Sequence, residues 1–463
     1  MLEGLEAVEV KLGSVINNKD FRIDSDFYTK EPKKNNRLNY KKIGDCLVNS
    51  QYGISISMNE DNIGYPIYRM NEIHDMLCDL DVDKHADISK SEFDKFELKH
   101  KDVLFNRTNS FEWVGRTGVY YQNDNTKRTF ASYLVRFNPD ENVIIAEYLV
   151  AYLNSKYGVW DIKRRARQSI NQTNVNPEEV KEIEIPIISR QIQECIKSNF
   201  ELANNKRIIA RMLYSKAEDI LLTELGLKDW EPTDQSATQK NFSDFLTSGR
   251  LDAEYYQPKY DEIEVKINNY VGGVMQLGEL FDVRDINYIP RDNTKYKYIE
   301  LSNIGNNGDI MGCSNEYGSE LPSRARRIVQ AGDLIVSSIE GSLQSCAIVT
   351  EDYNNALCST GFYVLRPKLI NKESALVLFK SRCIQQLMKK ACSGTILTAM
   401  NKDEFIKLKL PKLQEQVQLQ IALKIQESFA LRAESKRLLD LAKTAVEVAI
   451  EQGEEKAMEL LKN

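Results

Sequence analysis

Few residues of this chain are of a type and spacing that could do chemistry by themselves. The only histidines are His74, His85 and His100, and none has cysteine or histidine partners at the spacing of a zinc site. The acid-rich stretch 177–184 ends in alternating acidic and apolar residues, which favours a half-buried strand with solvated acids over a nuclease metal site. The eight cysteines are scattered and include no CxxC pair, a pattern typical of reduced intracellular thiols.

The sequence also lacks the motifs with which proteins hold reactive cofactors. No GxxxxGK[ST] segment is present to cradle a nucleotide, and the glycine run 305–312 has the wrong spacing for a dinucleotide fingerprint. There is no Asn/Asp-Pro-Pro-Tyr/Phe segment, with which an amino-methylating enzyme holds its target base. We therefore expect a chain that is not an enzyme and that binds no cofactor and no metal.

Composition bounds the kind of partner. The chain has 463 residues, of which 42% are hydrophobic and 28% charged, as in ordinary folded proteins. No window is apolar enough to span a membrane, and the first residues lack a secretory signal, so we expect a cytoplasmic protein. The net charge of −6 argues against a surface that coats nucleic acid throughout, but a basic face remains compatible with it. Charges do segregate, since 72–94 is acidic whereas 163–167 reads Lys-Arg-Arg-Ala-Arg.

An internal repeat is the strongest signal in the sequence. Five segments of the first half return in the second half, in the same order and at offsets of 225 to 234 residues. The paired segments are 22–28 with 250–256, 42–45 with 276–279, 101–105 with 332–336, 131–135 with 359–363 and 176–186 with 401–411. Solenoid repeats are far shorter, so one large module has been duplicated, which predicts a pseudo-symmetric chain.

Each module has a strand-rich part followed by a long helix. Short strands separated by Gly, Asn and Pro predict a compact mixed domain, with a helix near 144–157 and its counterpart near 373–391. After Pro186 and again after Pro411, apolar residues recur three or four apart over some 35 residues, which is roughly 50 Å of helix. Each helix could pack on its own domain, but an antiparallel pair that joins the modules is favoured because helices of this length overhang such domains.

The order of these features, present twice, resembles the specificity subunit of type I restriction-modification systems. The resemblance is carried by the Asp-x-Leu-Phe and Asp-x-Ile-Val runs, the aromatic-rich strand 131–135, the segments 168–186 and 393–411, and the two long helices. It extends from about residue 20 to residue 450.

The resemblance implies an α+β fold with two pseudo-symmetric mixed target-recognition domains separated by an antiparallel pair of long α-helices, a coiled-coil spacer. The implied parts are target-recognition domain 1 (1–187), spacer helix 1 (188–227), a polar connector (228–249), target-recognition domain 2 (250–412), spacer helix 2 (413–452) and a C-terminal tail (453–463).

The implied function is DNA recognition in phage defence. Such a chain reads a split, asymmetric sequence in double-stranded DNA and positions two modification (methyltransferase) subunits and the motor-nuclease restriction subunits, with no role at a membrane. The S-adenosylmethionine, ATP and Mg²⁺ of the complex are expected in these partner subunits.

Loops beside the strands are where domains of this family bind DNA. In the first module the candidates for base contacts are Asn106, Arg107, Thr108 and Arg116, since Arg can fork onto guanine and Asn onto adenine. Pairing of the arginines with surface acids is an equally open alternative. The cluster Arg164, Arg165 and Arg167 is expected to hold phosphates, with a solvated helix face as its alternative. The second-module counterparts are Tyr288, Arg291, Arg324, Arg326, Arg327 and Ser338.

Other functions remain open. A DNA-modifying enzyme complete in one chain is disfavoured by the missing motifs. A duplicated protein-interaction adaptor without DNA specificity would account for the long helices and for the acidic stretch 72–94. Within the family itself, a system that methylates without cutting cannot be told from one that cleaves.

Overall fold

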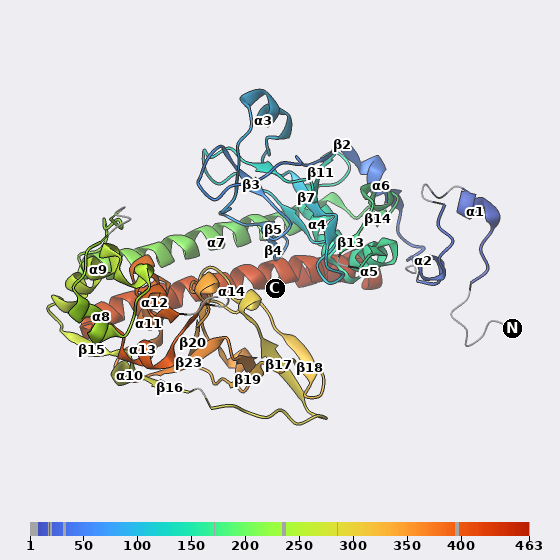
Figure 1. Ribbon diagram of the computed structural model, residues 1–463. Helices are drawn as coiled ribbons and strands as arrows, with labels where there is room; N and C mark the ends of the chain where they lie inside the picture. Colours follow the sequence, from blue (N-terminus) through green and yellow to red (C-terminus); the bar gives the residue numbers. More distant parts are fainter. Residues whose placement is uncertain are drawn as a thin grey trace. The chain divides into compact units, whose positions relative to one another are not determined.

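The computed structural model describes residues 8–16, 18, 21–30, 34–170, 172–233, 238–284, 286–393 and 398–462. These divide into two compact units (Figure 1). Unit 1 combines the described residues up to 208 with those from 432, and unit 2 consists of those between 209 and 431. Each unit joins a strand-rich mixed domain to parts of two long helices, α7 (Arg190–Glu224) and α14 (Glu415–Gln452).

Besides its share of the long helices, unit 1 contains α1 (Leu12–Ile16), α2 (Ser25–Thr29), β1 (Tyr40–Lys42), η1 (Ile43–Cys46), β2 (Leu47–Tyr52), β3 (Tyr65–Tyr68), β4 (Ile73–His74), β5 (Leu77–Cys78), β6 (His85–Ala86), α3 (Lys90–Phe96), β7 (Val103–Asn106), β8 (Thr108–Asn109), β9 (Thr117–Val119), β10 (Thr129–Phe130), β11 (Leu134–Pro139), α4 (Ala146–Asn154), α5 (Lys156–Arg165), β12 (Arg167–Gln168), β13 (Thr173–Asn174), α6 (Pro177–Lys181), β14 (Glu184–Pro186) and α15 (Glu454–Lys462).

Unit 2 contains α8 (Phe242–Ser248), η2 (Ala253–Tyr256), α9 (Pro258–Asn268), β15 (Val274–Gln276), α10 (Leu277–Leu280), β16 (Phe281–Val283), β17 (Lys295–Ile299), η3 (Leu301–Asn303), β18 (Ser314–Tyr317), β19 (Ala325–Ile328), β20 (Leu334–Ser337), η4 (Glu340–Ser342), β21 (Cys346–Ile348), η5 (Glu351–Tyr353), β22 (Leu357–Ser359), β23 (Phe362–Pro367), α11 (Lys372–Lys380), α12 (Arg382–Lys390), β24 (Cys392–Ser393), β25 (Ala399–Met400), α13 (Lys402–Lys407) and β26 (Lys409–Pro411).

One central strand in each unit separates two cores. In unit 1 this strand is β7, within the sheet ordered β2-β11-β7-β9-β5-β4, and in unit 2 it is β20, within β16-β23-β20-β21. Successive side chains of a strand point to opposite faces, so Phe105 of β7 enters the core shared with α4 while Leu104 enters a second core. In β20, Val336 faces the core shared with α11 while Ile335 faces a smaller one. Near-continuous apolar strands are what burial on both faces requires.

The two units share individual hydrogen bonds at equivalent positions of the repeat. In unit 1, Arg22 pairs with Asp24 at 2.7 Å, and the hydroxyl of Tyr28 donates to the Arg22 carbonyl at 2.9 Å. In unit 2, Arg250 pairs with its own Asp252 at 2.6 Å, and the Tyr256 hydroxyl donates to the Arg250 carbonyl at 2.8 Å. The expected pseudo-symmetric α+β fold is thus confirmed.

The two long helices pack against each other in each unit and run antiparallel. In unit 1 the buried Ser435 hydroxyl donates to the Ala203 carbonyl at 2.9 Å, and the amide of Ser189, which precedes α7, donates to Glu454, which follows α14, at 2.9 Å. In unit 2 the buried Ser428 hydroxyl donates in the same way to the carbonyl of Ala210 at 2.7 Å.

Small buried residues recur every seven positions along both helices. They are Ala203, Ala210 and Ala217 on α7, and Ser428, Ser435, Ala442 and Ala449 on α14. A seven-residue repeat of buried side chains is the seam of a coiled coil, and small side chains on it let two backbones approach closely.

Some expectations about helices need correction. The helix expected near 144–157 is α4, and α5 follows it after Ser155. The single helix expected near 373–391 is two helices, α11 and α12, separated at Ser381. Ser155 and Ser381 both adopt extended backbone angles and bond their hydroxyls to carbonyls three residues earlier. The polar stretch 228–249 contains α8 in its described part, begun by a capping box at Asn241. The expected tail after residue 452 forms α15, which follows Gly453 at φ +97°.

Candidate nucleic-acid interface

The loop between β8 and β9 is closed by a pair of backbone hydrogen bonds. The Asn106 amide donates to the Arg116 carbonyl at 2.8 Å, and the Gly115 amide donates to the Asn106 carbonyl at 2.8 Å. The Asn106 side chain is fully buried and bonds the carbonyl of Met70 and the amide of Thr108, each at 3.3 Å. Asn106 therefore anchors the base of the loop.

Arg107 leaves the end of β7 with its guanidinium against an aromatic ring. Its backbone is fixed on both sides, since its amide donates to Tyr133 at 3.0 Å and its carbonyl accepts from Val175 at 2.9 Å. The guanidinium carbon lies 5.2 Å from the centroid of the Tyr52 ring. The Arg107 Nε is buried and has no hydrogen-bond partner in the described part of the chain.

Arg116 stacks on Trp113. Its guanidinium carbon lies 3.3 Å from the centroid of that ring, and burial lowers the pKa of Arg116 to about 10. Among the described residues neither Arg116 nor Arg107 forms an ion pair with an acid, so the alternative in which they neutralise surface carboxylates is not what the structure shows.

A small polar sheet adjoins Arg107. Its strand order is β12-β13-β8, with Arg167 opposite Asn174 and Asn174 opposite Thr108. The Thr108 hydroxyl donates to the Asn174 side chain, and Arg167 is exposed. Strand β13 therefore lies between Arg167 on β12 and Thr108 on β8, the residue after Arg107.

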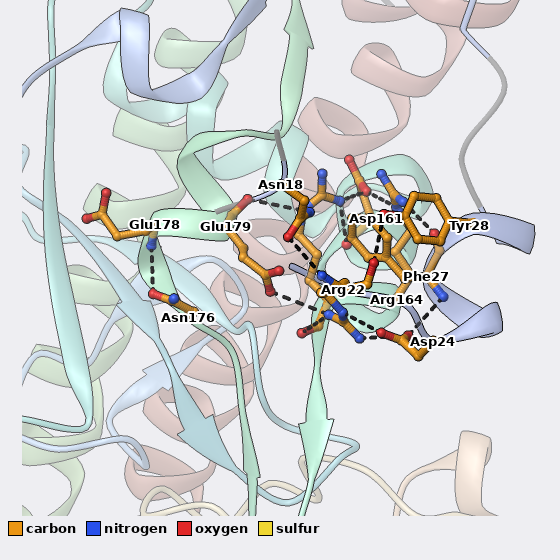
Figure 2. Close-up of polar contacts among 11 residues, drawn as sticks. Asn18, Arg22, Asp24, Phe27, Tyr28, Asp161, Arg164, Asn176, Glu178 and Glu179 are labelled. Atoms are coloured by element: carbon orange, nitrogen blue, oxygen red, sulfur yellow. Dashed lines mark hydrogen bonds and ion pairs between the residues drawn. The ribbon is translucent and has the colours of Figure 1, made fainter. Parts of the chain in front are cut away.

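The side chains of Arg164 (Figure 2) and Arg165 are both buried inside the domain. Arg164 pairs with Asp161 and donates to the Phe27 carbonyl at 2.6 Å, while Arg165 donates to the Glu179 carbonyl at 3.0 Å. Both guanidinium groups also pack over the Phe27 ring, at 4.4 and 5.5 Å from its centroid. This burial contrasts with the expectation of a phosphate-facing cluster, because neither side chain is presented to solvent.

Unit 2 repeats the backbone frame with a different residue in the position of Arg107. The amide of Ser338 donates to the Gly361 carbonyl at 2.8 Å, and the Ser338 carbonyl accepts from Met400 at 2.7 Å. These bonds match those of Arg107 to Tyr133 and Val175. The Ser338 hydroxyl is turned inward and donates to the same Gly361 carbonyl at 2.9 Å.

The other candidates of unit 2 surround strands β17 and β19. Tyr288 lies with its hydroxyl 3.2 Å from that of Tyr296, which also accepts from the amide of the exposed Arg291 at 3.1 Å. Arg324 is exposed and donates to Glu300 at 2.7 Å. The rest lie on β19: Arg326 donates to the Ser323 carbonyl at 2.9 Å, and Arg327 is half-buried.

Sequence reasoning missed the aromatic partners of the arginines. Tyr52 and Trp113 carry the guanidinium groups of Arg107 and Arg116. Trp113 could have been noticed as an aromatic residue three positions before an arginine in a polar loop, whereas nothing in the sequence links Tyr52 to Arg107. In the described part of the chain no cluster of His, Cys, Asp and Glu could hold a metal ion, and no helix is long and apolar enough to cross a membrane.

Comparison with known proteins identifies a family domain in the second half. Residues 273–439 match the family model of the type I restriction modification DNA specificity domain. The chain is 28% identical over 151 residues to a putative type I restriction enzyme MjaX specificity subunit of Methanocaldococcus jannaschii, a match that covers 32% of this chain and 35% of that protein. It is 27% identical over 120 residues to the type I restriction enzyme EcoKI specificity subunit of Escherichia coli K12, covering 26% and 25%. These matches thus span only about a quarter to a third of the relatives' lengths.

Two solved structures of type I specificity subunits align with most of the chain at low TM-scores. The type I S subunit from M. genitalium aligns over 93% of this chain and 95% of its own, with a TM-score of 0.35 and 13% identity. The HsdS subunit from Thermoanaerobacter tengcongensis aligns over 91% and 98%, with a TM-score of 0.29 and 12% identity. The chain thus contains a match to the type I restriction modification DNA specificity domain at residues 273–439, and parts of it are similar in sequence to specificity subunits of type I restriction enzymes.

Proposed function

We propose that this chain selects the DNA target of a type I restriction-modification complex, reading one half of a split sequence with each unit. The observation that carries the proposal is the repeated backbone frame that presents Arg107 in unit 1 and Ser338 in unit 2. Two copies of one frame with different side chains recognise different half-sites. The target is therefore asymmetric, whereas a symmetric dimer would select a palindrome.

The division of labour follows the two modules. Residues 1–187 and 250–412 act as the target-recognition domains. Residues 188–227 and 413–452 form the spacer, with 228–249 as the connector between modules. The support for a spacer is the seam of small buried residues with a seven-residue period, which holds two antiparallel helices at a fixed distance.

Base contacts in unit 1 come from the segment that follows β7, whose own residues are all buried. Arg107 and Arg116 face the DNA, whereas the buried Asn106 and Thr108 support them from inside the domain. Arg167 contacts phosphate beside them. The buried Arg164 and Arg165 shape the domain around Phe27 instead of binding phosphate.

Unit 2 uses a different set of side chains. Tyr288, Arg291 and Arg324 are the candidates for its half-site, since the guanidinium groups of both arginines are at the surface. Arg326 and Arg327 stabilise the same surface from strand β19. Ser338, whose hydroxyl is already bonded to Gly361, acts through its backbone.

The chemistry belongs to partner subunits. The chain itself is non-catalytic. Two modification subunits supply S-adenosylmethionine-dependent methylation, and motor-nuclease subunits use ATP and Mg²⁺ for cleavage.

Selection from a random DNA library by the assembled complex tests the proposal. The wild-type chain with its modification subunit is expected to enrich one split, asymmetric motif, and its affinity for random DNA should fall steeply with salt. Arg107→Ala is expected to relax one half of the motif by about ten-fold, since a bidentate arginine–guanine contact contributes ~1–3 kcal/mol. Enrichment of no motif, with affinity independent of salt, would instead favour the protein-interaction adaptor.

A further inference from the structure

We infer that Lys163 is a positioning residue that sets the DNA sequence read by unit 1, by holding the loop 110–116 in the shape that presents its aromatic side chains. The inference rests on the proposed function and names a residue that determines specificity without contacting DNA itself. It is carried by the contacts that α5 makes with this loop.

The loop 110–116 forms one helical turn, and no second turn follows whose amides could bond to its carbonyl groups. The amides of Trp113 and Val114 both donate to the Ser110 carbonyl, at 3.1 and 2.9 Å. The chain then leaves for β9, so the carbonyls at the end of the turn have no partners within a continuing helix. Such carbonyls need outside donors, and a lysine side chain is well suited to supply them.

Lys163 supplies these donors. Its ammonium group donates to the carbonyls of Phe111, of Glu112 at 3.1 Å and of Val114 at 2.9 Å. An ammonium has three donors, and this arrangement uses all of them on one loop. In the described part of the chain no carboxylate lies within ion-pair distance of the ammonium. The ammonium group of Lys163 therefore serves to hold the loop in its conformation.

A second contact from α5 constrains the same loop. Gly115 has φ +92°, and a Cβ atom at this position would lie 2.6 Å from Cγ2 of Ile162, the residue before Lys163. A side chain at this position would collide with Ile162, so the close approach to α5 and the positive φ both favour glycine. Two consecutive helix residues fix the loop, one by close packing and one by hydrogen bonds.

The side chains held in this way are suited to contact bases. Phe111 is 46% exposed and Trp113 is 41% exposed, although large aromatic residues are usually buried. Arg116 stacks on Trp113. In double-stranded DNA an exposed aromatic ring can insert as a wedge between base steps, and an arginine beside it can fork onto a guanine. A loop that slackened would keep these side chains but lose their geometry.

Unit 2 supplies a matched control. Ser155 immediately precedes α5, and Ser381 immediately precedes α12. Lys389 follows Ser381 by the same number of residues as Lys163 follows Ser155. Its ammonium lies 3.6 Å from Glu340 and 3.5 Å from Glu254, both carboxylates. The same helical position therefore forms ion pairs in unit 2 and caps backbone carbonyls in unit 1.

The test uses Lys163→Met in the assembled complex with the modification subunit, scored by selection from a random DNA library. We expect discrimination at one half-site to fall about ten-fold. The other half-site should be unchanged, and the affinity for random DNA should stay within two-fold of wild type. Lys389→Met should leave the half-site affected by Lys163→Met unchanged. If Lys163→Met weakens binding to all sequences equally, Lys163 is a phosphate contact and the inference is overturned.

Trp113→Ala is a second test, needed in case Lys163→Met does not fold. The Trp113 side chain lies partly in solvent, so its removal should not unfold the domain. It should relax the same half-site with an unchanged melting temperature. If both Lys163→Met and Trp113→Ala select the same motif as the wild-type complex, the inference is overturned. The proposed function is then still supported by the motif that the wild-type complex selects. Failure of the wild-type complex to select any motif would overturn the proposed function itself.

Discussion

A buried ion pair sits at the start of the central strand in both units. In unit 1 the Asp102 carboxylate, which is 3% exposed, accepts from Arg136 at 3.0 Å and from the amide of Lys99 at 2.8 Å. In unit 2, Asp333 is fully buried and pairs with Arg366 at 2.5 Å. These aspartates begin the repeated Asp-x-Leu and Asp-x-Ile runs of the sequence.

Removing the arginine should harm the two units unequally. Arg136 is 10% exposed and is the only ion-pair partner of Asp102 among the described residues, so Arg136→Met strands a buried carboxylate at a cost of ~3–5 kcal/mol. Arg366 is 31% exposed, and Arg284 lies 3.9 Å from the same Asp333 carboxylate. A second cation and nearby solvent remain after Arg366→Met, so we expect a loss of only ~1 kcal/mol.

The loss in Arg136→Met should depend on pH. Burial raises the pKa of Asp102, and Arg136 opposes that rise, so the variant raises the pKa further. A carboxyl that binds its proton more tightly in the folded state than in the unfolded state destabilises the fold once it ionises. The deficit of Arg136→Met should therefore be largest at neutral pH and shrink as the pH falls towards protonation of Asp102.

Native-state hydrogen exchange measured by mass spectrometry is the suitable assay, because a chain of two units has no single free energy of unfolding. Peptides covering β7 and β11 report on unit 1, and peptides covering β20 and β23 report on unit 2. Equal losses for Arg136→Met and Arg366→Met, or a deficit in Arg136→Met that grows as the pH falls, would refute the reasoning.

Other predictions concern the joints of the fold. Gln193 accepts a hydrogen bond from the amide of Ile145 at 3.1 Å, and Gln418 accepts one from the amide of Asn371 at 2.8 Å, each at the start of a helix. Gln193→Leu and Gln418→Leu should therefore each lower local stability by ~1–3 kcal/mol, measured by hydrogen exchange. Unchanged exchange at these amides would contradict this. Gly115→Ala should lower local stability by ~1–3 kcal/mol, because Gly115 has a positive φ and lies close to α5. The loss should appear as faster hydrogen exchange in the loop 110–116, and unaltered exchange there would contradict the prediction. Seven residues inserted into both long helices keep the seam in register and add about 10 Å of helix. The gap between the two half-sites of the recognised DNA motif should then lengthen by about three base pairs. An unchanged gap with retained methylation would show that the helices do not set this distance.

The sequence predicted the duplicated architecture because repetition is a property of residue order alone. The paired segments 22–28 and 250–256 form the same ion pair and the same tyrosine hydrogen bond in both units. The long helices followed from apolar spacing. The helix breaks at Ser155 and Ser381 did not, because a serine that bonds a preceding carbonyl can equally continue a helix.

The candidate site was less accessible to sequence reasoning. Arg164 and Arg165 have the composition of a surface cluster, and only the fold reveals that Asp161 and Phe27 surround them. The role of Lys163 depends on three carbonyl groups some 50 residues away in the chain, and carbonyls leave no trace in a sequence. Local patterns therefore predict which elements form, whereas side-chain partners depend on tertiary packing.

A strand-resolved methylome tests the central claim most directly. This chain is expressed with its modification subunit in a host that lacks adenine methylation, beside controls that express either chain alone. The account predicts methylated adenines in one split, asymmetric motif, present only when both chains are present. Methylation of the same motif without this chain, or no methylation by a folded and assembled complex of both, would contradict it.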